Sequence, residues 1–162
     1  MSDTQKMTFR MAVPGDGPLI LSFIRALAEY EQMLDQVVAT ADLLEEELFQ
    51  KGHAQVLFAL EDGKEVGFAL FFHNFSTFLG RAGLYLEDLF VLPAYRGRGY
   101  GKGLLQELAR IARERGYGRM EWWCLNWNQP SIDFYHSLGA KAMDEWTVFR
   151  MTEDTIQNLA EE

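Results

Sequence analysis

Apolar residues recur along the chain with two different periods, and the changes of period divide the sequence into helices and strands. Residues 7–13, MTFRMAV, have the composition of a strand. After the turn PGDGP, helical spacing predicts a helix that carries Ile20, Phe23, Ile24, Leu27 and Tyr30. Thr40 or Asp42 is a suitable cap for a second helix, ADLLEEELFQK, which we expect to end at Gly52.

Beyond this helix the pattern becomes that of strands. AQVLFAL and EVGFALFFHNF flank the turn EDGK and predict a hairpin, and GLYLEDLFV follows as a third strand. Later segments predict a helix closed near Gly116, a strand RMEWWCLNW, a helix QPSIDFYHSLGA and a final strand or two in AMDEWTVFRM. This order predicts a mixed α/β domain around one sheet, with residues 1–162 forming a single domain.

The overall charge narrows the classes of partner. A net charge of −9 over 162 residues disfavours binding to nucleic acid and to anionic membrane surfaces, and favours a cationic small molecule. The single cysteine, Cys124, and a polar N-terminal stretch lead us to expect a cytoplasmic protein. The three histidines lack the spacing of metal ligands, so we expect no metal site.

A glycine-rich turn, VLPAYRGRGYGKGLL at 91–105, joins a strand to a helix. Such a turn presents free backbone N–H groups and the positive end of a helix dipole, and it suits a phosphate. The spacing excludes a P-loop, because Arg96 stands where the first glycine would be. It also excludes the dinucleotide fingerprint, because glycine recurs at every second position.

The segment from Arg96 to Gly101 matches R/Q-x-x-G-x-G/A, and here the chain resembles the GNAT acetyltransferases. The context, LYLEDLFVLPAYRG before the turn and WNQPSIDFYHSLGA after it, resembles the diamine (spermidine/spermine) and thialysine acetyltransferase branch. The resemblance implies a mostly antiparallel mixed sheet flanked by helices and splayed at the cofactor site, acetyl-CoA as co-substrate, and a homodimer. It implies cofactor contacts from Leu89, Phe90, Val91, Arg96, Gly97, Arg98, Gly99, Tyr100, Gly101, Lys102, Asn128, Ser131 and Tyr135.

Acetyl transfer to an amine needs a base, because the amine must lose a proton before it attacks. Simple strand alternation puts Glu87 on the side of Leu89 and Val91, and Asp88 on the opposite side with Leu86 and Phe90. We therefore expect Glu87 to be the base, acting through water, and Asp88 to orient the substrate. From the resemblance, Tyr30 and Glu31 are expected to bind the amine.

The departing thiolate needs a proton donor, and Tyr135 is the candidate. Asn128, Ser131 and Tyr135 fall at i, i+3 and i+7 and are predicted to share one helix face. The sequence leaves other functions open: an acetyltransferase for a protein lysine or N-terminal amine, a non-catalytic acyl-CoA-binding module, and, disfavoured by charge, a phosphate-binding or nucleic-acid-binding domain.

Overall fold

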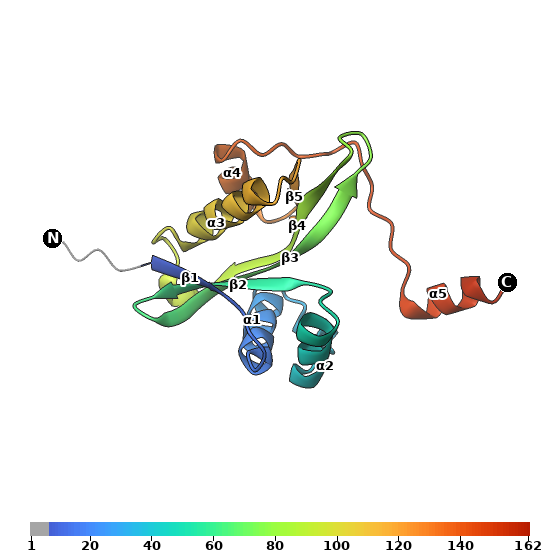
Figure 1. The fold of residues 1–162 in the computed structure, drawn as a ribbon, viewed down its shortest axis with the longest axis horizontal. Helices are drawn as coiled ribbons and strands as arrows, with labels where there is room; N and C mark the ends of the chain where they lie inside the picture. The colour runs from blue at the N-terminus through green and yellow to red at the C-terminus, as the bar shows by residue number, and fades with distance from the viewer. Residues whose placement is uncertain (1–6) are drawn as a thin grey trace. The chain divides into compact units, whose positions relative to one another are not determined.

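A five-stranded sheet organises the first of the two units into which the chain divides, Met1–Trp123 and Cys124–Glu162. The computed structural model describes residues 7–162 (Figure 1). The sheet order is β1-β2-β3-β4-β5, antiparallel except for the parallel pair β4 and β5. The strands are β1 Met7–Met11, β2 Gln55–Glu61, β3 Lys64–Ser76, β4 Arg81–Val91 and β5 Met120–Trp122.

One face of the sheet is covered by α1 (Gly17–Tyr30) and by the helix that follows it (Figure 1). The short 3-10 helix η1 (Leu34–Gln36) lies between the two. The second helix begins as α2 (Ala41–Glu45) and continues as the π-helix η2 (Glu46–Gln50). Thr40 caps it as expected, accepting a hydrogen bond from the Leu43 N–H at 3.1 Å. The core on this face contains Ile20, Phe23, Leu27, Leu48, Phe58, Phe68 and Phe90.

The opposite face is covered by α3 (Tyr100–Glu114), which follows the 3-10 turn η3 (Pro93–Tyr95) (Figure 1). The predicted stripe of α3 is inside, since Leu104, Leu105 and Leu108 are at most 6% exposed. Gly103 lets α3 approach β1, because a Cβ there would lie 2.6 Å from the Met7 Sδ. The sequence therefore predicted these helices and the buried stripe of α3, and the resemblance implied a sheet flanked by helices.

The pairing of β3 with β4 shifts register in the middle of the sheet. Leu70 faces Asp88 while Phe71 faces Leu86, so Glu87 is an extra residue, a β-bulge. Asp88 consequently shares a face with Phe90, toward α1, but not with Leu86. Simple alternation had grouped all three, and this grouping was wrong because a bulge reverses the faces of the residues beyond it.

The second unit is helical. It contains α4 (Gln129–Ser137), as predicted, and α5 (Glu153–Ala160), which the sequence pattern did not reveal. The final strand expected in 142–151 was wrong, since no strand forms between Cys124 and Glu162. The strand expected over 119–127 is reduced to the three residues of β5. Both segments have strand composition, but composition does not supply the neighbouring strand with which each must form hydrogen bonds.

The mixed α+β class with a mostly antiparallel sheet flanked by helices is confirmed. The single-domain organisation over 1–162 stays a prediction. No helix within residues 7–162 combines the length and the apolar composition needed to cross a membrane.

Candidate active site

The glycine-rich turn leads directly into the N-terminus of α3. Gly97 and Gly99 have φ values of 78° and 90°, in the left-handed region that favours glycine. Gly99 is the N-cap residue, no side chain caps the helix, and no acidic residue lies in the first turn. The first N–H groups of α3 and its positive dipole end are therefore unopposed, which favours an anion at this place.

Space around the turn is open on the side where a ligand would approach. A Cβ added at Gly97 or Gly101 would meet no atom within 4 Å, and one at Gly99 would only reach the Met7 Cε at 4.0 Å. Gly101 has an ordinary helical φ, so its backbone conformation does not require glycine. The missing side chain instead leaves room for a ligand. A pyrophosphate fits these observations, because its oxygens need close approach to backbone amides.

Two residues of the turn are anchored to the far end of β2. The Arg98 Nη1 donates to both carboxylate oxygens of Glu61, at 2.9 and 3.0 Å, and the Tyr100 hydroxyl donates to Glu61 at 2.7 Å. The hydrogen bond from Tyr100 lowers the pKa of Glu61, while burial beside that carboxylate raises the pKa of Tyr100. Glu61 thus holds the turn in place.

The sequence analysis did not identify Glu61, the residue that anchors the turn. Glu61 lies 37 residues before its partner Arg98. An acidic residue at the end of a buried strand was the only local signal. Because Tyr100 is only 2% exposed, its side chain serves the anchor, and its backbone N–H remains for a ligand. Lys102 is exposed at the start of α3.

Arg96 connects the turn to the end of α1. Its guanidinium lies over the rings of Tyr30 and Phe90, 4.7 and 5.0 Å from their centroids, and its Nε donates to the Val91 carbonyl at 3.1 Å. Arg96, predicted to contact the cofactor, is therefore in direct contact with Tyr30, predicted to bind the amine.

The edge of β4 is open where the turn begins. Within the described residues β5 pairs with Leu84–Leu86 only, so the stretch from Glu87 to Val91 has β3 on one side and no strand on the other. Backbone groups of the predicted residues Leu89, Phe90 and Val91 lie in this stretch. The sheet is therefore splayed beside the glycine-rich turn, and an extended ligand with amide groups can align with the open edge.

Three carboxylates lie near the bulge and the end of α1. Glu87 is exposed and Asp88 is half-buried. Burial, followed by the charges of Glu87 and Glu31, raises the pKa of Asp88 to about 7, and burial raises the pKa of Glu31. Such a cluster attracts a cationic amine, and a carboxylate with a pKa near 7 is suited to exchange a proton at neutral pH.

The raised pKa of Asp88 predicts a pH dependence of stability. Between the unfolded pKa of 3.8 and about 7, the folded protein keeps a proton on Asp88 that the unfolded chain has lost. The free energy of unfolding therefore falls as pH rises through this window, by a few kcal/mol at most if each pKa unit contributes about 1.4 kcal/mol. Asp88→Asn should remove this loss.

Urea unfolding of the wild type and of Asp88→Asn at pH 5 and pH 8 tests this expectation. The variant should gain stability relative to the wild type between the two pH values. An equal pH dependence in both proteins would contradict the raised pKa of Asp88. Glu29→Gln, an exposed carboxylate change on α1, is the matched control and should leave the dependence unchanged.

Asn128, Ser131 and Tyr135 belong to the second unit. Asn128 caps α4, its Oδ1 accepting from the Ser131 N–H at 3.4 Å. The helix bounds put Ser131 and Tyr135 on one face of α4, with Asn128 just before the helix as its N-cap, and the Tyr135 ring lies 5.6 Å from that of Phe134. The first unit contains the turn, the open edge and the carboxylates, and the second contains the candidate proton donor.

Comparison with known proteins identifies the family of the chain. Residues 22–140 match the acetyltransferase (GNAT) family. A thialysine N-epsilon-acetyltransferase from Bos taurus is 35% identical over 163 residues, which cover 93% of this chain and 95% of that protein. An L-ornithine N5-acetyltransferase from Arabidopsis thaliana is 42% identical over 100 residues, or 62% of this chain. The match covers only 44% of that longer relative.

A solved structure has the same fold. An integron cassette protein from the mobile metagenome of V. cholerae superimposes with a TM-score of 0.81 at 27% identity, covering 96% of this chain and 98% of that one. The family match spans the glycine-rich turn, the β4 bulge and α4. GNAT acetyltransferases use acetyl-CoA as co-substrate. The chain belongs to the acetyltransferase (GNAT) family and is an acyltransferase.

Proposed function

We propose that the protein transfers the acetyl group of acetyl-CoA to a primary amine of a small cationic acceptor, by direct attack of the amine. The observation that carries this proposal is the uncapped N-terminus of α3, which opens beside the free edge of β4 and the carboxylates at its bulge. Anion binding, alignment of an extended ligand and attraction of a cation are thus available within one unit.

The cofactor contacts follow from this geometry. The N–H groups at Gly99, Tyr100 and Gly101 would hold the pyrophosphate, and Lys102 adds positive charge without blocking the turn. The backbone from Leu89 to Val91 would align the pantetheine arm. Arg96 and Arg98 contribute chiefly by holding the turn, since their guanidinium groups contact Tyr30, Phe90 and Glu61. Acetyl-CoA supplies a thioester, whose carbonyl carbon is open to attack by an amine.

Glu87 would accept the proton of the acceptor amine, through water, from its exposed position in the bulge. Asp88, Glu31 and Tyr30 would hold and orient the cationic acceptor. The carboxylate charges stabilise the ammonium form on binding, and loss of one proton produces the free amine that attacks. The amine nitrogen forms the new C–N bond as the C–S bond breaks, and it then releases its second proton to solvent, from which the proton donor of the thiolate is restored.

Tyr135 would donate its hydroxyl proton to the departing thiolate, since a phenol with a reference pKa of about 10 is protonated at neutral pH. Asn128, at the N-cap of α4, and Ser131, on the same face of the helix as Tyr135, would contact the cofactor. Asn128 keeps its amide NH₂ for this purpose because the cap uses its oxygen.

The relatives favour an acceptor that resembles lysine. The two named above acetylate thialysine and L-ornithine, and a third, a spermidine/spermine N(1)-acetyltransferase-like protein from Homo sapiens, is 34% identical over 93% of this chain and 23% of that protein. Thialysine, lysine-like amines and polyamines all present a primary amine on a flexible chain. The alternatives are a protein amine as the acceptor, or acyl-CoA binding without turnover. We also propose that the protein is cytoplasmic and forms a homodimer.

Release of free thiol from acetyl-CoA across an amine panel tests this function. The panel contains lysine, thialysine, putrescine, spermidine, spermine and an aminoglycoside. We expect turnover with a lysine-like amine or a polyamine, and no release without an acceptor. Binding of CoA by calorimetry with no turnover on any amine would overturn the proposed small-molecule acceptor and favour a protein acceptor or a binding module.

A further inference from the structure

A polar cluster joins β3 to β5 near the bulge of β4, and the proposed acetyl transfer has not used it so far. The Asn74 Nδ2 donates to the Glu121 Oε1 at 3.3 Å, and the Arg119 Nε lies 3.3 Å from the same oxygen. The Arg119 Nη2 donates to the Phe75 carbonyl, also at 3.3 Å. We call Asn74, Arg119 and Glu121 the Arg119–Glu121 cluster; all three belong to the first unit.

The hydrogen bonds of this cluster are incomplete within residues 7–162. The Asn74 Oδ1 and the Arg119 Nε are buried atoms without a hydrogen-bond partner, because the Arg119 Nε–H is not directed at the nearby Glu121 oxygen. In the same part of the chain the Glu121 Oε2 accepts no hydrogen bond and the Arg119 Nη1 donates none. Buried polar atoms are usually paired, so the cluster indicates a place where a polar ligand completes the bonding.

The register of the sheet puts the cluster on the same face as the proposed acceptor carboxylates. Glu121 pairs with Tyr85, which directly precedes the buried Leu86 and so points to the opposite face. The bulge at Glu87 brings Asp88 to that opposite face as well. The side chains of Glu121 and Asp88 therefore lie on one side of the sheet.

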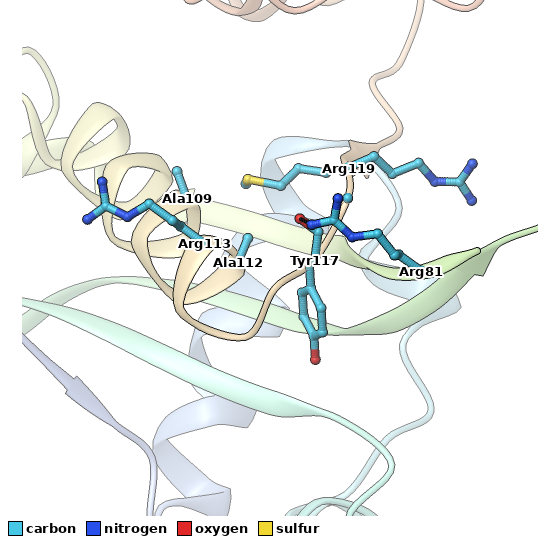
Figure 2. Close-up of a pocket in the computed structure, with 8 residues that line it drawn as sticks. Arg81, Ala109, Ala112, Arg113, Tyr117 and Arg119 are labelled. Carbon is cyan, nitrogen blue, oxygen red and sulfur yellow. Dashed lines mark hydrogen bonds between the residues drawn. The ribbon is translucent and has the colours of Figure 1, made fainter. Parts of the chain in front are cut away.

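Arg119 directs its charge away from α3. Figure 2 shows its guanidinium extending from the hollow beside α3, away from Ala109 and Arg113. The guanidinium instead reaches the Phe75 carbonyl and the Glu121 carboxylate. A cation and an anion are thus held next to each other, each with an atom left to bind a ligand group of the opposite charge.

The spacing between the bulge and the cluster suits an acceptor of a particular length. Glu121 is level with Tyr85, two residues before Glu87. A strand rises about 3.3 Å per residue, so the two backbone positions are about 7 Å apart, roughly the length of an extended lysine side chain. The Tyr85 ring, 5.0 Å from the Phe72 ring and 6.1 Å from the Trp123 ring, gives this stretch an apolar surface for methylene groups.

We propose that the Arg119–Glu121 cluster binds the α-ammonium and α-carboxylate of a free amino acid whose side-chain amine is acetylated. This inference rests on the proposed function, because it places the side-chain amine at the carboxylates of the bulge. Glu121 would accept hydrogen bonds from the α-ammonium, and Arg119 would donate to the α-carboxylate. Asn74 would keep the Glu121 carboxylate in position, and the methylene groups would pack on Tyr85.

The same cluster would discriminate against polyamines and protein lysines. A polyamine has a second ammonium group where the amino acid has an ammonium and a carboxylate, so it would leave Arg119 without an anion and bring like charges together. A lysine within a protein chain has neither a free α-ammonium nor a free α-carboxylate. We therefore expect the acceptor to be a free amino acid such as lysine, ornithine or thialysine.

Acceptor pairs that differ only in the α-carboxylate test this specificity. The pairs are lysine with cadaverine and ornithine with putrescine, and thiol release from acetyl-CoA is the readout. We expect kcat/KM to be at least about tenfold higher for each amino acid than for its diamine, as one charge-assisted hydrogen bond can provide. Arg119→Gln should raise KM for the amino acids by about the same factor, with kcat little changed, and should leave both diamines unaffected.

Glu121→Gln tests the other half of the site. It should raise KM for lysine but not for Nα-acetyl-lysine, which has no α-ammonium. Arg113→Gln and Glu114→Gln, exposed changes on α3 at the other face of the sheet, are the matched controls and should leave KM and kcat unchanged. Equal kcat/KM for lysine and cadaverine in the wild type, or equal losses for amino acids and diamines in Arg119→Gln, would overturn the proposal.

Calorimetric titration of lysine and ornithine in the presence of CoA separates this inference from the proposed activity. Binding that is lost in Arg119→Gln and in Glu121→Gln, while both variants unfold thermally like the wild type, supports the cluster even if no amine is acetylated. Turnover of a diamine without measurable binding of either amino acid would overturn the inference and leave the proposed transfer standing. A folded wild type that binds neither amino acid overturns it in every case.

Discussion

Replacing Gly101 with leucine is expected to abolish CoA binding while the domain stays folded. The backbone at Gly101 is helical and a side chain there would enter empty space, so no fold contact is lost. Leucine also favours a helix over glycine by somewhat less than about 1 kcal/mol. The side chain would instead fill the space above the first amides of α3. Loss of two charged hydrogen bonds, at about 1.5 kcal/mol or more each, weakens binding about 100-fold or more.

Calorimetric titration with CoA and thermal unfolding measure both parts of this prediction. Glu114→Leu, at the exposed far end of the same helix, is the control and should bind CoA normally. Gly101 is a cleaner probe than Gly99, where φ is 90° and any side chain strains the turn. Unchanged affinity in a folded Gly101→Leu protein would show that the turn does not hold the pyrophosphate.

The second large effect is expected for the two proposed catalytic residues. Glu87→Gln removes the proton acceptor at the bulge and Tyr135→Phe removes the proton donor on α4. Each should lower kcat by about 100-fold or more while CoA still binds, because general acid and base catalysis contributes roughly 10²–10⁴. Thiol-release kinetics measure kcat, and calorimetry measures CoA affinity.

A pH series distinguishes a chemical role from a structural one. The deficit of Glu87→Gln should shrink as pH approaches the pKa of the amine, about 10.4 for a lysine-like group, because the free amine becomes abundant without a base. Glu29→Gln and Tyr117→Phe are the isosteric controls, and both should keep full activity. Full activity of Glu87→Gln at neutral pH would assign the base elsewhere, with Asp88 as the next candidate because of its raised pKa.

Local patterns were enough to predict most of the first unit. The helical spacing of Ile20, Phe23 and Leu27 identified α1 and its buried side, and the turn EDGK marked the hairpin of β2 and β3. The glycine-rich turn and the start of α3 followed from the glycines, which adopt the left-handed backbone of such a turn, and from the apolar stripe after them. These features depend on residues that are close together in the chain, so the local sequence is enough to predict them.

Features that depend on distant residues were not predictable. The bulge at Glu87 is a mismatch between two strands, and one strand read alone contains no sign of it. Both arginines of the turn were expected to contact the cofactor, which stays a prediction, and the contacts of Arg98 with Glu61 and of Arg96 with Tyr30 were not foreseen. The strand expected in 142–151 failed for the same reason, since a strand requires a partner that its own residues do not specify.

The anchor at Glu61 determines when the conformational entropy of the glycine-rich turn is lost. A turn with three glycines among six residues is conformationally flexible in isolation. If the turn became ordered only when a ligand bound, the affinity for that ligand would be weakened by about 1–2 kcal/mol per residue fixed. Because Arg98 and Tyr100 are already bound to Glu61, this loss occurs once, when the chain folds. Under the proposed function, each catalytic cycle would therefore begin with an ordered binding surface, and CoA would leave after turnover without the turn having to reform.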